Sequence, residues 1–182
     1  MTLQGIQPIL FALLTVAMDP AWAAGKNVEA NTSGYEAGVR TAAGESVNTA
    51  EFYVRRPAPL LEEYVLPYLP AGGTARWETA LSYWSGDNDH AVVFALGPTL
   101  EYPLPWTNWG LTLGIQPTLF SNYESDNRNL GGPFEFTSHI GVRWQSNPDW
   151  YIGARMQHTS NAGIYDSNPG VDLLAVEIGS GF

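Results

Sequence analysis

Three residues near the C-terminal end of the chain, His158, Ser160 and Asp172, have side chains that can together hydrolyse an ester. A serine hydroxyl becomes a nucleophile when a histidine takes its proton, and a carboxylate then orients and stabilises the imidazolium. In a β-strand, His158 and Ser160 lie on one face, roughly 7 Å apart at Cβ. If the next strand pairs Ser160 near Asp172, the carboxylate lies diagonal to His158 and completes a triad. The His-x-Ser spacing alone is common, so two polar residues at a strand end are the alternative interpretation.

The two segments that carry these residues alternate between apolar and polar side chains, as strands with one face in lipid do. In residues 150–160 the even-numbered side chains are Trp, Ile, Ala and Met, then His158 and Ser160, whereas Arg and Gln are odd-numbered. In residues 171–182 Asp172 has the same parity as a Leu, a Val and an Ile. We therefore expect all three candidate residues on the lipid face, where polar side chains are most costly.

The rest of the chain repeats this period-two pattern, which indicates further strands. The expected strands are residues 34–41, 49–55, 74–84, 90–102, 109–121, 134–145, 150–160 and 171–182. Their polar faces combine charges with small residues, which suits a narrow lumen. Their apolar faces are expected to carry an aromatic girdle near the strand ends, formed by Trp84, Trp109, Trp144, Trp150 and Tyr151. The pattern predicts an all-β fold, an eight-stranded antiparallel transmembrane β-barrel of outer-membrane type; an aromatic-rich soluble sandwich is the alternative.

The lumen and the connections of this barrel follow from the same parity. Charged residues on the inward faces are expected to form an ion-pair network: Arg40, Arg143, Arg155, Glu36, Glu78 and Glu177. Polar loops are expected at the extracellular end, between alternate strand pairs. The periplasmic connection, residues 56–73, is longer than usual for that side. We expect its Leu and Tyr residues to lie along the inner headgroup region.

Composition and the two chain ends indicate the number of domains, the classes of partner and the cellular targeting of the protein. The 182 residues suit a single domain, and a net charge of −10 with only eight basic residues argues against a nucleic-acid partner. The chain has no cysteine, and its histidines and carboxylates show no ligand spacing, so no metal and no cofactor are expected. The apolar run 6–18 and the small-residue site 21–23 predict a signal peptide over 1–23 and a barrel over 24–182; a buried N-terminal helix is the alternative. The final phenylalanine resembles the signal that the outer-membrane assembly machinery recognises.

The segment HTSNAGIYDSNPGVD, residues 158–172, resembles the active-site hairpin of the outer-membrane lipid A 3-O-deacylases, the PagL family. The matching residues are His158, Ser160, Asn161, Ala162, Gly163, Asn168 and Gly170, and the similarity extends to NLGGPFEF before the sixth strand. The resemblance implies a cell-outer-membrane enzyme that hydrolyses the ester-linked 3-hydroxyacyl chain at position 3 of lipid A, a part of lipopolysaccharide. Ser160 and His158 would be catalytic.

The resemblance also implies an oxyanion site, and it departs from the family at one position. The expected oxyanion or substrate-binding residues are Asn161, Ala162, Gly163 and Asn168. Asp172 stands where the family motif has glutamate, which is one methylene longer. The competing hypothesis is a non-catalytic barrel with a structural or partner-binding role. Outer-membrane lipids are expected partners, and the oligomeric state, a homodimer included, is left open by the sequence.

Overall fold

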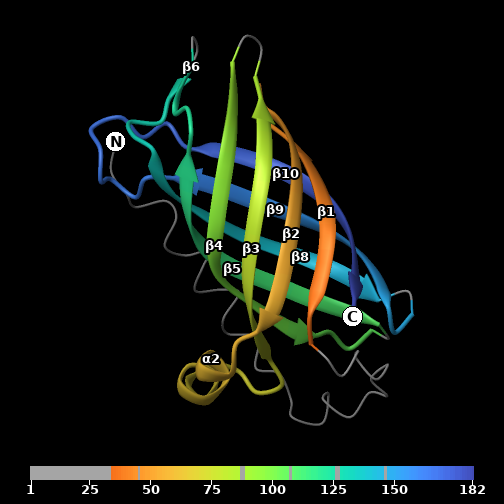
Figure 1. Cartoon of the computed structure of the whole chain (residues 1–182). Helices are drawn as coiled ribbons and strands as arrows, with labels where there is room; N and C mark the ends of the chain where they lie inside the picture. Colours follow the sequence, from red (N-terminus) through yellow and green to blue (C-terminus); the bar gives the residue numbers. More distant parts are fainter. Residues whose placement is uncertain (1–33, 45, 87–88, 107, 126–127, 146) are drawn as a thin grey trace.

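The fold is a closed β-barrel, seen in a computed structural model that describes residues 34–44, 46–86, 89–106, 108–125, 128–145 and 147–182. The expected signal peptide lies outside these residues and stays a prediction. Eight antiparallel strands close in the order β1-β10-β9-β8-β5-β4-β3-β2 (Figure 1). Their bounds are β1 Glu36–Ala43, β2 Asn48–Pro57, β3 Thr74–Ser85, β4 His90–Pro103, β5 Trp109–Phe120, β8 Phe134–Gln145, β9 Trp150–Ser160 and β10 Val171–Gly181. Closure pairs every long strand on both sides, so the barrel of eight expected strands is confirmed.

The two ends of the barrel differ in their connections. The segments between β1 and β2, β3 and β4, β5 and β8, and β9 and β10 lie at one end, called here the loop end. The segment between β2 and β3 lies at the opposite end, the α2 end (Figure 1). It contains the helix α2 (Pro59–Tyr64) and the 3-10 helix η2 (Leu66–Tyr68), which the alternation pattern had not indicated. Within the described ranges no helix is long and apolar enough to cross a bilayer.

The strand faces sort into lumen and outer surface largely as the parity predicts. In β9 and β10 the odd-numbered residues are mostly buried and most even-numbered residues are exposed. The expected aromatic girdle is wrong at two positions, because Trp84 and Tyr151 are buried inside the barrel. Both have the parity of lumen residues on their strands, and a regular strand cannot turn one such side chain outward without a bulge. Trp109 and Trp150 do lie on the outer surface.

The middle of the lumen holds the expected ion-pair network, which is confirmed. The buried Glu78 carboxylate lies at its centre, 2.6 Å from Arg55 Nε, 3.2 Å from Arg155 Nη1 and 3.3 Å from Arg40 Nη1. Arg40 Nη2 also lies 2.7 Å from Glu177 Oε2. The remaining expected pair joins Arg143 Nη1 to Glu36 Oε1 at 3.1 Å. Charges that face one another across a narrow lumen are thus paired and hydrogen-bonded, as buried charges require.

The loop end of the lumen is apolar instead. A buried cluster there consists of Ala42, Trp84, Ala91, Val93, Phe120, Leu130, Val171, Leu173 and Ala175. Trp84 and Phe120 meet edge to face with ring centroids 5.0 Å apart. Leu130 comes from the connection 121–133, which also forms the short hairpin β6 (Glu124–Ser125) and β7 (Arg128–Asn129). Burying Leu130 therefore draws this connection over the barrel mouth, beside the end of β9.

Candidate active site

A histidine and an aspartate lie side by side on the outer surface of the barrel near its loop end. His158 of β9 pairs directly with Asp172 of β10, and its Nδ1 lies 2.7 Å from Asp172 Oδ1. The diagonal arrangement expected from the sequence is wrong, because the observed register places the two residues opposite each other. On the other side of His158, Ser138 of β8 is its cross-strand partner. The side chains of His158 and Asp172 are 49% and 85% exposed, so both point away from the lumen, as the parity predicts.

Ser160 is the last residue of β9 and lies two positions along the strand from His158. It is half-buried and pairs with Phe136 of β8. Among the contacts of the described residues, no hydrogen bond joins the Ser160 hydroxyl to the imidazole. Catalytic hydrogen bonds often form or tighten only once substrate is bound. The structure thus pairs the histidine with the acid and places the serine two residues further along the same strand.

Gly170 has no side chain, and this leaves room for the imidazole of His158 to pack against its backbone. A Cβ atom at Gly170 would lie 2.8 Å from His158 Cε1 and 3.4 Å from Nε2, and the backbone there has a φ of +66°. The Cε1–Nε2 edge of the ring is therefore turned toward Gly170, which immediately precedes Val171, the partner of Thr159. Since Ser160 follows Thr159, this edge points toward the serine end of the hairpin. In the sequence, Gly170 is recognisable only as part of the family motif. That it leaves room for the imidazole of His158 becomes visible only in the folded hairpin.

The loop after Ser160 uses most of its expected oxyanion donors internally. Asn161 Oδ1 accepts from the Gly163 amide at 2.9 Å, and the Asn161 amide donates to Asn168 Oδ1 at 3.1 Å. Asn161 is fully buried, and its Nδ2 donates to the carbonyl oxygens of Leu130 and Ser167. Of the donors expected from the sequence, the Asn168 side-chain amide and the Ala162 backbone amide have no such contact among the described residues. These two are the better candidates for an oxyanion site.

The same contacts join the loop 161–170 to the connection 121–133. Asn161 Nδ2 lies 2.7 Å from Leu130 O and 2.6 Å from Ser167 O, and Ser167 Oγ donates to Asn129 O at 2.7 Å. Gly132 lies against the ring of Tyr165 so closely that a Cβ atom would be 2.2 Å from Tyr165 Cζ. We call this set of contacts the loop clasp. In the sequence, the loop clasp corresponds to the NLGGPFEF motif, because the glycines of this motif leave room for the Tyr165 ring.

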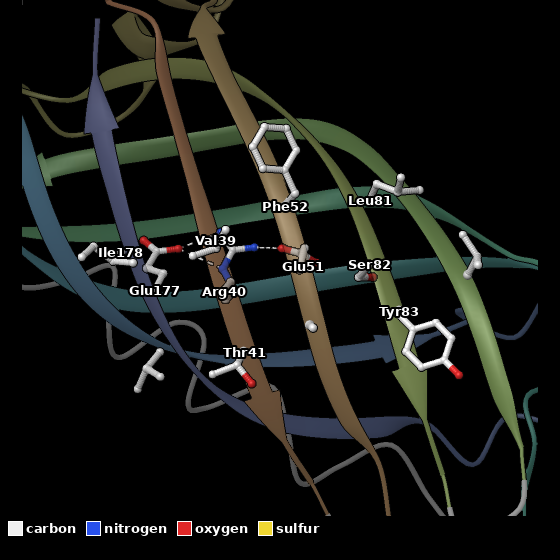
Figure 2. Close-up of a pocket in the computed structure, with 13 residues that line it drawn as sticks. Val39, Arg40, Thr41, Glu51, Phe52, Leu81, Ser82, Tyr83, Glu177 and Ile178 are labelled. Atoms are coloured by element: carbon white, nitrogen blue, oxygen red, sulfur yellow. Dashed lines mark hydrogen bonds and ion pairs between the residues drawn. The ribbon is translucent and has the colours of Figure 1, made fainter.

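A shallow apolar groove lies on the outer surface beside the candidate site. Its exposed walls come from β10, β1, β2, β3 and β4, and Figure 2 shows Val39, Phe52, Leu81 and Tyr83 along it. The small residues Thr41 and Ala50 contribute to its lining. Its edge on β10 includes Val176, four residues along that strand from Asp172, or roughly 13 Å. The groove and the His–Asp pair are thus separate features that both lie on the outer surface and share strand β10.

These features define a small membrane barrel of the outer-membrane type, with a candidate ester-hydrolysing site on its outer face. The chain belongs to the lipid A 3-O-deacylase (PagL) family, whose model matches residues 67–180, a range that includes His158, Ser160 and Asp172. The family match and the closed barrel assign the protein to the bacterial outer membrane.

Two curated relatives carry the same family name. The chain is 33% identical over 103 residues to the lipid A deacylase PagL of Bordetella bronchiseptica, covering 53% of this chain and 56% of the relative. It is 27% identical over 107 residues to the lipid A deacylase PagL of Pseudomonas aeruginosa, covering 57% of this chain and 62% of the relative. The matches therefore span somewhat more than half the length of each relative.

Solved structures agree on the fold. The crystal structure of the outer-membrane enzyme PagL matches with a TM-score of 0.60 at 20% identity, covering 81% of this chain and 99% of that one. The N-terminal β-barrel domain of Pseudomonas aeruginosa OprF matches with a TM-score of 0.52 at 13% identity, covering 81% and 96%. At these identities the likeness concerns the barrel alone, and an activity has to be argued from the site.

Proposed function

We propose that this barrel is a lipid A 3-O-deacylase, a serine esterase that hydrolyses the ester-linked 3-hydroxyacyl chain at position 3 of lipid A in the outer leaflet. The observation that carries the proposal is the His158–Asp172 hydrogen bond of 2.7 Å on the lipid-facing surface near the loop end. Ionisable side chains on a lipid-facing surface are rare because burying them in lipid is costly, so this pair marks a candidate functional site. Membership of the PagL family supports lipid A as the substrate.

The residues suggest the following reaction. Ser160 Oγ attacks the acyl carbonyl carbon while His158 Nε2 takes the hydroxyl proton, and Asp172 holds the Nδ1–H and stabilises the imidazolium. The Ala162 amide and the Asn168 side-chain amide are the candidate donors to the oxyanion. When the tetrahedral intermediate collapses, the ester C–O bond breaks and His158 returns its proton to the sugar oxygen. Water, deprotonated by the same imidazole, then attacks the acyl carbon; the Ser160 Oγ–acyl bond breaks, the fatty acid leaves, and His158 returns the proton to Ser160 Oγ.

The position of the site favours a membrane-embedded ester over a soluble one. His158 and Asp172 share the outer face of β9 and β10 with Met156 and Leu174, which are both exposed there. An amphiphile in the bilayer brings its ester to this level without leaving the membrane. The apolar groove beside β10 (Figure 2) is available to hydrocarbon from such a lipid. Contact with the outer-membrane assembly machinery, and a homodimer, remain predictions.

Replacing the nucleophile tests this proposal directly. The Ser160→Ala variant and the parent protein are produced in an outer membrane that contains 3-O-acylated lipid A, and the lipid A is analysed by mass spectrometry. We expect the parent to yield lipid A that lacks one 3-hydroxyacyl chain, and the variant to reduce this product by about 10³-fold or more, because the nucleophile is lost.

A matched control keeps the result interpretable. Ser138→Ala removes the other hydroxyl next to His158, on the neighbouring strand β8, and should leave most of the deacylation intact. Both variants should show the heat-dependent gel mobility of a folded barrel. A folded parent protein that leaves lipid A unchanged would favour the non-catalytic alternative, and equal activity of Ser160→Ala and the parent would remove Ser160 from the site.

A further inference from the structure

The connection between β2 and β3 exposes an unusual number of large apolar side chains. Leu60, Tyr64 and Tyr68 are 67%, 63% and 87% exposed. Leu60 and Tyr64 lie in α2 and Tyr68 ends η2. Neither short helix contains a buried residue, so this segment has no core of its own. Something outside the described residues must cover these side chains if they are not to face water.

The helix is fixed to the barrel by its opposite side. Glu62 Oε1 accepts a hydrogen bond from the Ala75 amide at 3.2 Å, and the Ala58 amide donates to Ala75 O at 3.1 Å. At about 100° per residue, Leu60 and Tyr64 lie within about 40° of each other, and Glu62 lies about 160–200° away from both. Because Glu62 faces the start of β3, the Leu60–Tyr64 side of α2 points away from the barrel wall.

The start of α2 lies at the level where a bilayer surface meets the barrel. Arg56 and Trp77 are cross-strand partners at the α2 end of β2 and β3, and Arg56 is exposed. Tryptophan and long basic side chains mark the headgroup level of membrane barrels. Further exposed tryptophans lie at the starts of β5 and β9 or in the turn before β5, all at the same end: Trp106, Trp109 and Trp150. Leu60 follows Arg56 by four residues, a reach of at most roughly 14 Å, which is enough to cross a headgroup layer of roughly 5–8 Å.

We propose that α2 and η2 lie on the bilayer surface at the α2 end, with Leu60, Tyr64 and Tyr68 inserted at the boundary between headgroups and acyl chains. The leaflet involved is the one opposite the candidate active site. Residues 57–73 contain two glutamates and no lysine or arginine, so apolar contact rather than attraction to anionic lipid holds the segment there. The outer surface of the barrel and this segment then form one continuous lipid-facing surface. This role does not depend on catalysis.

The absence of cysteine from the chain allows the depth of single side chains to be measured. Tyr64→Cys and Tyr68→Cys are spin-labelled in the otherwise unchanged protein, which is then reconstituted in vesicles of phosphatidylethanolamine and phosphatidylglycerol. Collisions with oxygen, which concentrates in lipid, and with a water-soluble nickel chelate report depth. Leu81→Cys, on the exposed outer face of β3, provides the lipid reference, and Ala71→Cys, exposed in the same connection, provides the aqueous reference.

We expect the labels at positions 64 and 68 to give oxygen-to-nickel ratios between the two references, several-fold above that of Ala71→Cys. The ratios should be insensitive to replacing phosphatidylglycerol with phosphatidylcholine. Ratios equal to that of Ala71→Cys would mean that the segment lies in water and would overturn the proposal. Protection from both reagents would also overturn it, because the segment would then be covered by protein. Neither measurement depends on enzymatic activity. A negative result would therefore contradict the membrane contact of this segment without bearing on the proposed esterase activity.

Discussion

At the scale of single residues, the register of the last hairpin explains how an aspartate can take the place of a glutamate. A carboxylate diagonal to His158 would need a longer side chain to reach the imidazole, whereas Asp172 lies directly across from it. Directly opposed residues have Cβ atoms about 4.5–5.5 Å apart, which suits a short acid. The observed 2.7 Å between Asp172 Oδ1 and His158 Nδ1 needs no backbone shift. An aspartate at this position is therefore long enough to serve as the third member of the proposed triad.

Substituting Asp172 tests this assignment. Asp172→Asn removes the charge that stabilises the imidazolium and favours the wrong tautomer of His158, so deacylation should fall by about 10²- to 10⁴-fold. Asp172→Glu keeps the charge and should retain activity within about tenfold of the parent. Rates are measured on purified protein with 3-O-acylated lipid A in detergent. If both variants react at the parental rate, the acid has no part in the reaction.

Gly170 is the second residue whose role can be isolated. A methyl group at this position would press on His158 Cε1, so Gly170→Ala should displace the imidazole and lower kcat by about 10²-fold. The left-handed backbone adds a stability loss of about 1–2 kcal/mol. Gly72→Ala is the matched control, since Gly72 also has a left-handed φ, of +92°, but a Cβ atom there would meet nothing within 4 Å. We expect similar shifts in unfolding midpoint for both variants and a loss of turnover for Gly170→Ala alone.

At the scale of structural elements, two loops from different parts of the barrel hold the candidate site together. The connection 121–133 is drawn over the barrel mouth by Leu130, and Asn161 ties it to the loop that follows Ser160. Asn161 makes five hydrogen bonds in this arrangement. Its side chain donates two and accepts one, its amide donates one, and its carbonyl accepts one from the Ile164 amide. It therefore acts as a positioning residue of the loop clasp.

Removing the Asn161 side chain should loosen the loop without unfolding the barrel. Asn161→Ala leaves two carbonyls and the Gly163 amide without their partner, at a cost of about 1 kcal/mol or more each. Deacylation should fall by on the order of 10²-fold, and amide hydrogen exchange over residues 161–170 should accelerate.

Hydrogen exchange separates this role from direct oxyanion binding. If Asn161 instead donated to the substrate, activity would fall while exchange in the loop stayed at the parental rate. Asn122→Ala provides the control within the connection 121–133, because its Oδ1 accepts only the local Glu124 amide among the described contacts. That variant should match the parent in both activity and exchange.

At the scale of the whole molecule, the barrel combines an ionic middle with an apolar loop end. Glu78 accepts hydrogen bonds from Arg40, Arg55, Arg155 and Gln116, which come from four different strands. Tyr53 and Tyr151 meet through their hydroxyls at 2.8 Å, and Arg143 lies over the Tyr151 ring. One carboxylate thus links β1, β2, β5 and β9 to β3 across the lumen.

Neutralising Glu78 should destabilise the barrel as a whole. Glu78→Gln leaves three buried guanidinium groups without their shared counter-charge, which should lower the free energy of unfolding by about 3–5 kcal/mol. The exposed Glu63→Gln provides the control and should change it by less than about 0.5 kcal/mol. Urea unfolding in vesicles, followed by tryptophan fluorescence, measures both. Equal stability of the two variants would show that the network does not hold the barrel closed.

The sequence by itself determined the strands and the face on which each side chain lies, because the period of two is a local property of extended backbone. It was therefore sufficient to predict eight strands, the lumen charges and the outward positions of His158 and Asp172. Only the tertiary structure decided that these two residues pair directly, since register depends on hairpin geometry and barrel closure. It also decided that Asn161 binds a loop from another part of the chain, because such contacts join residues far apart in sequence.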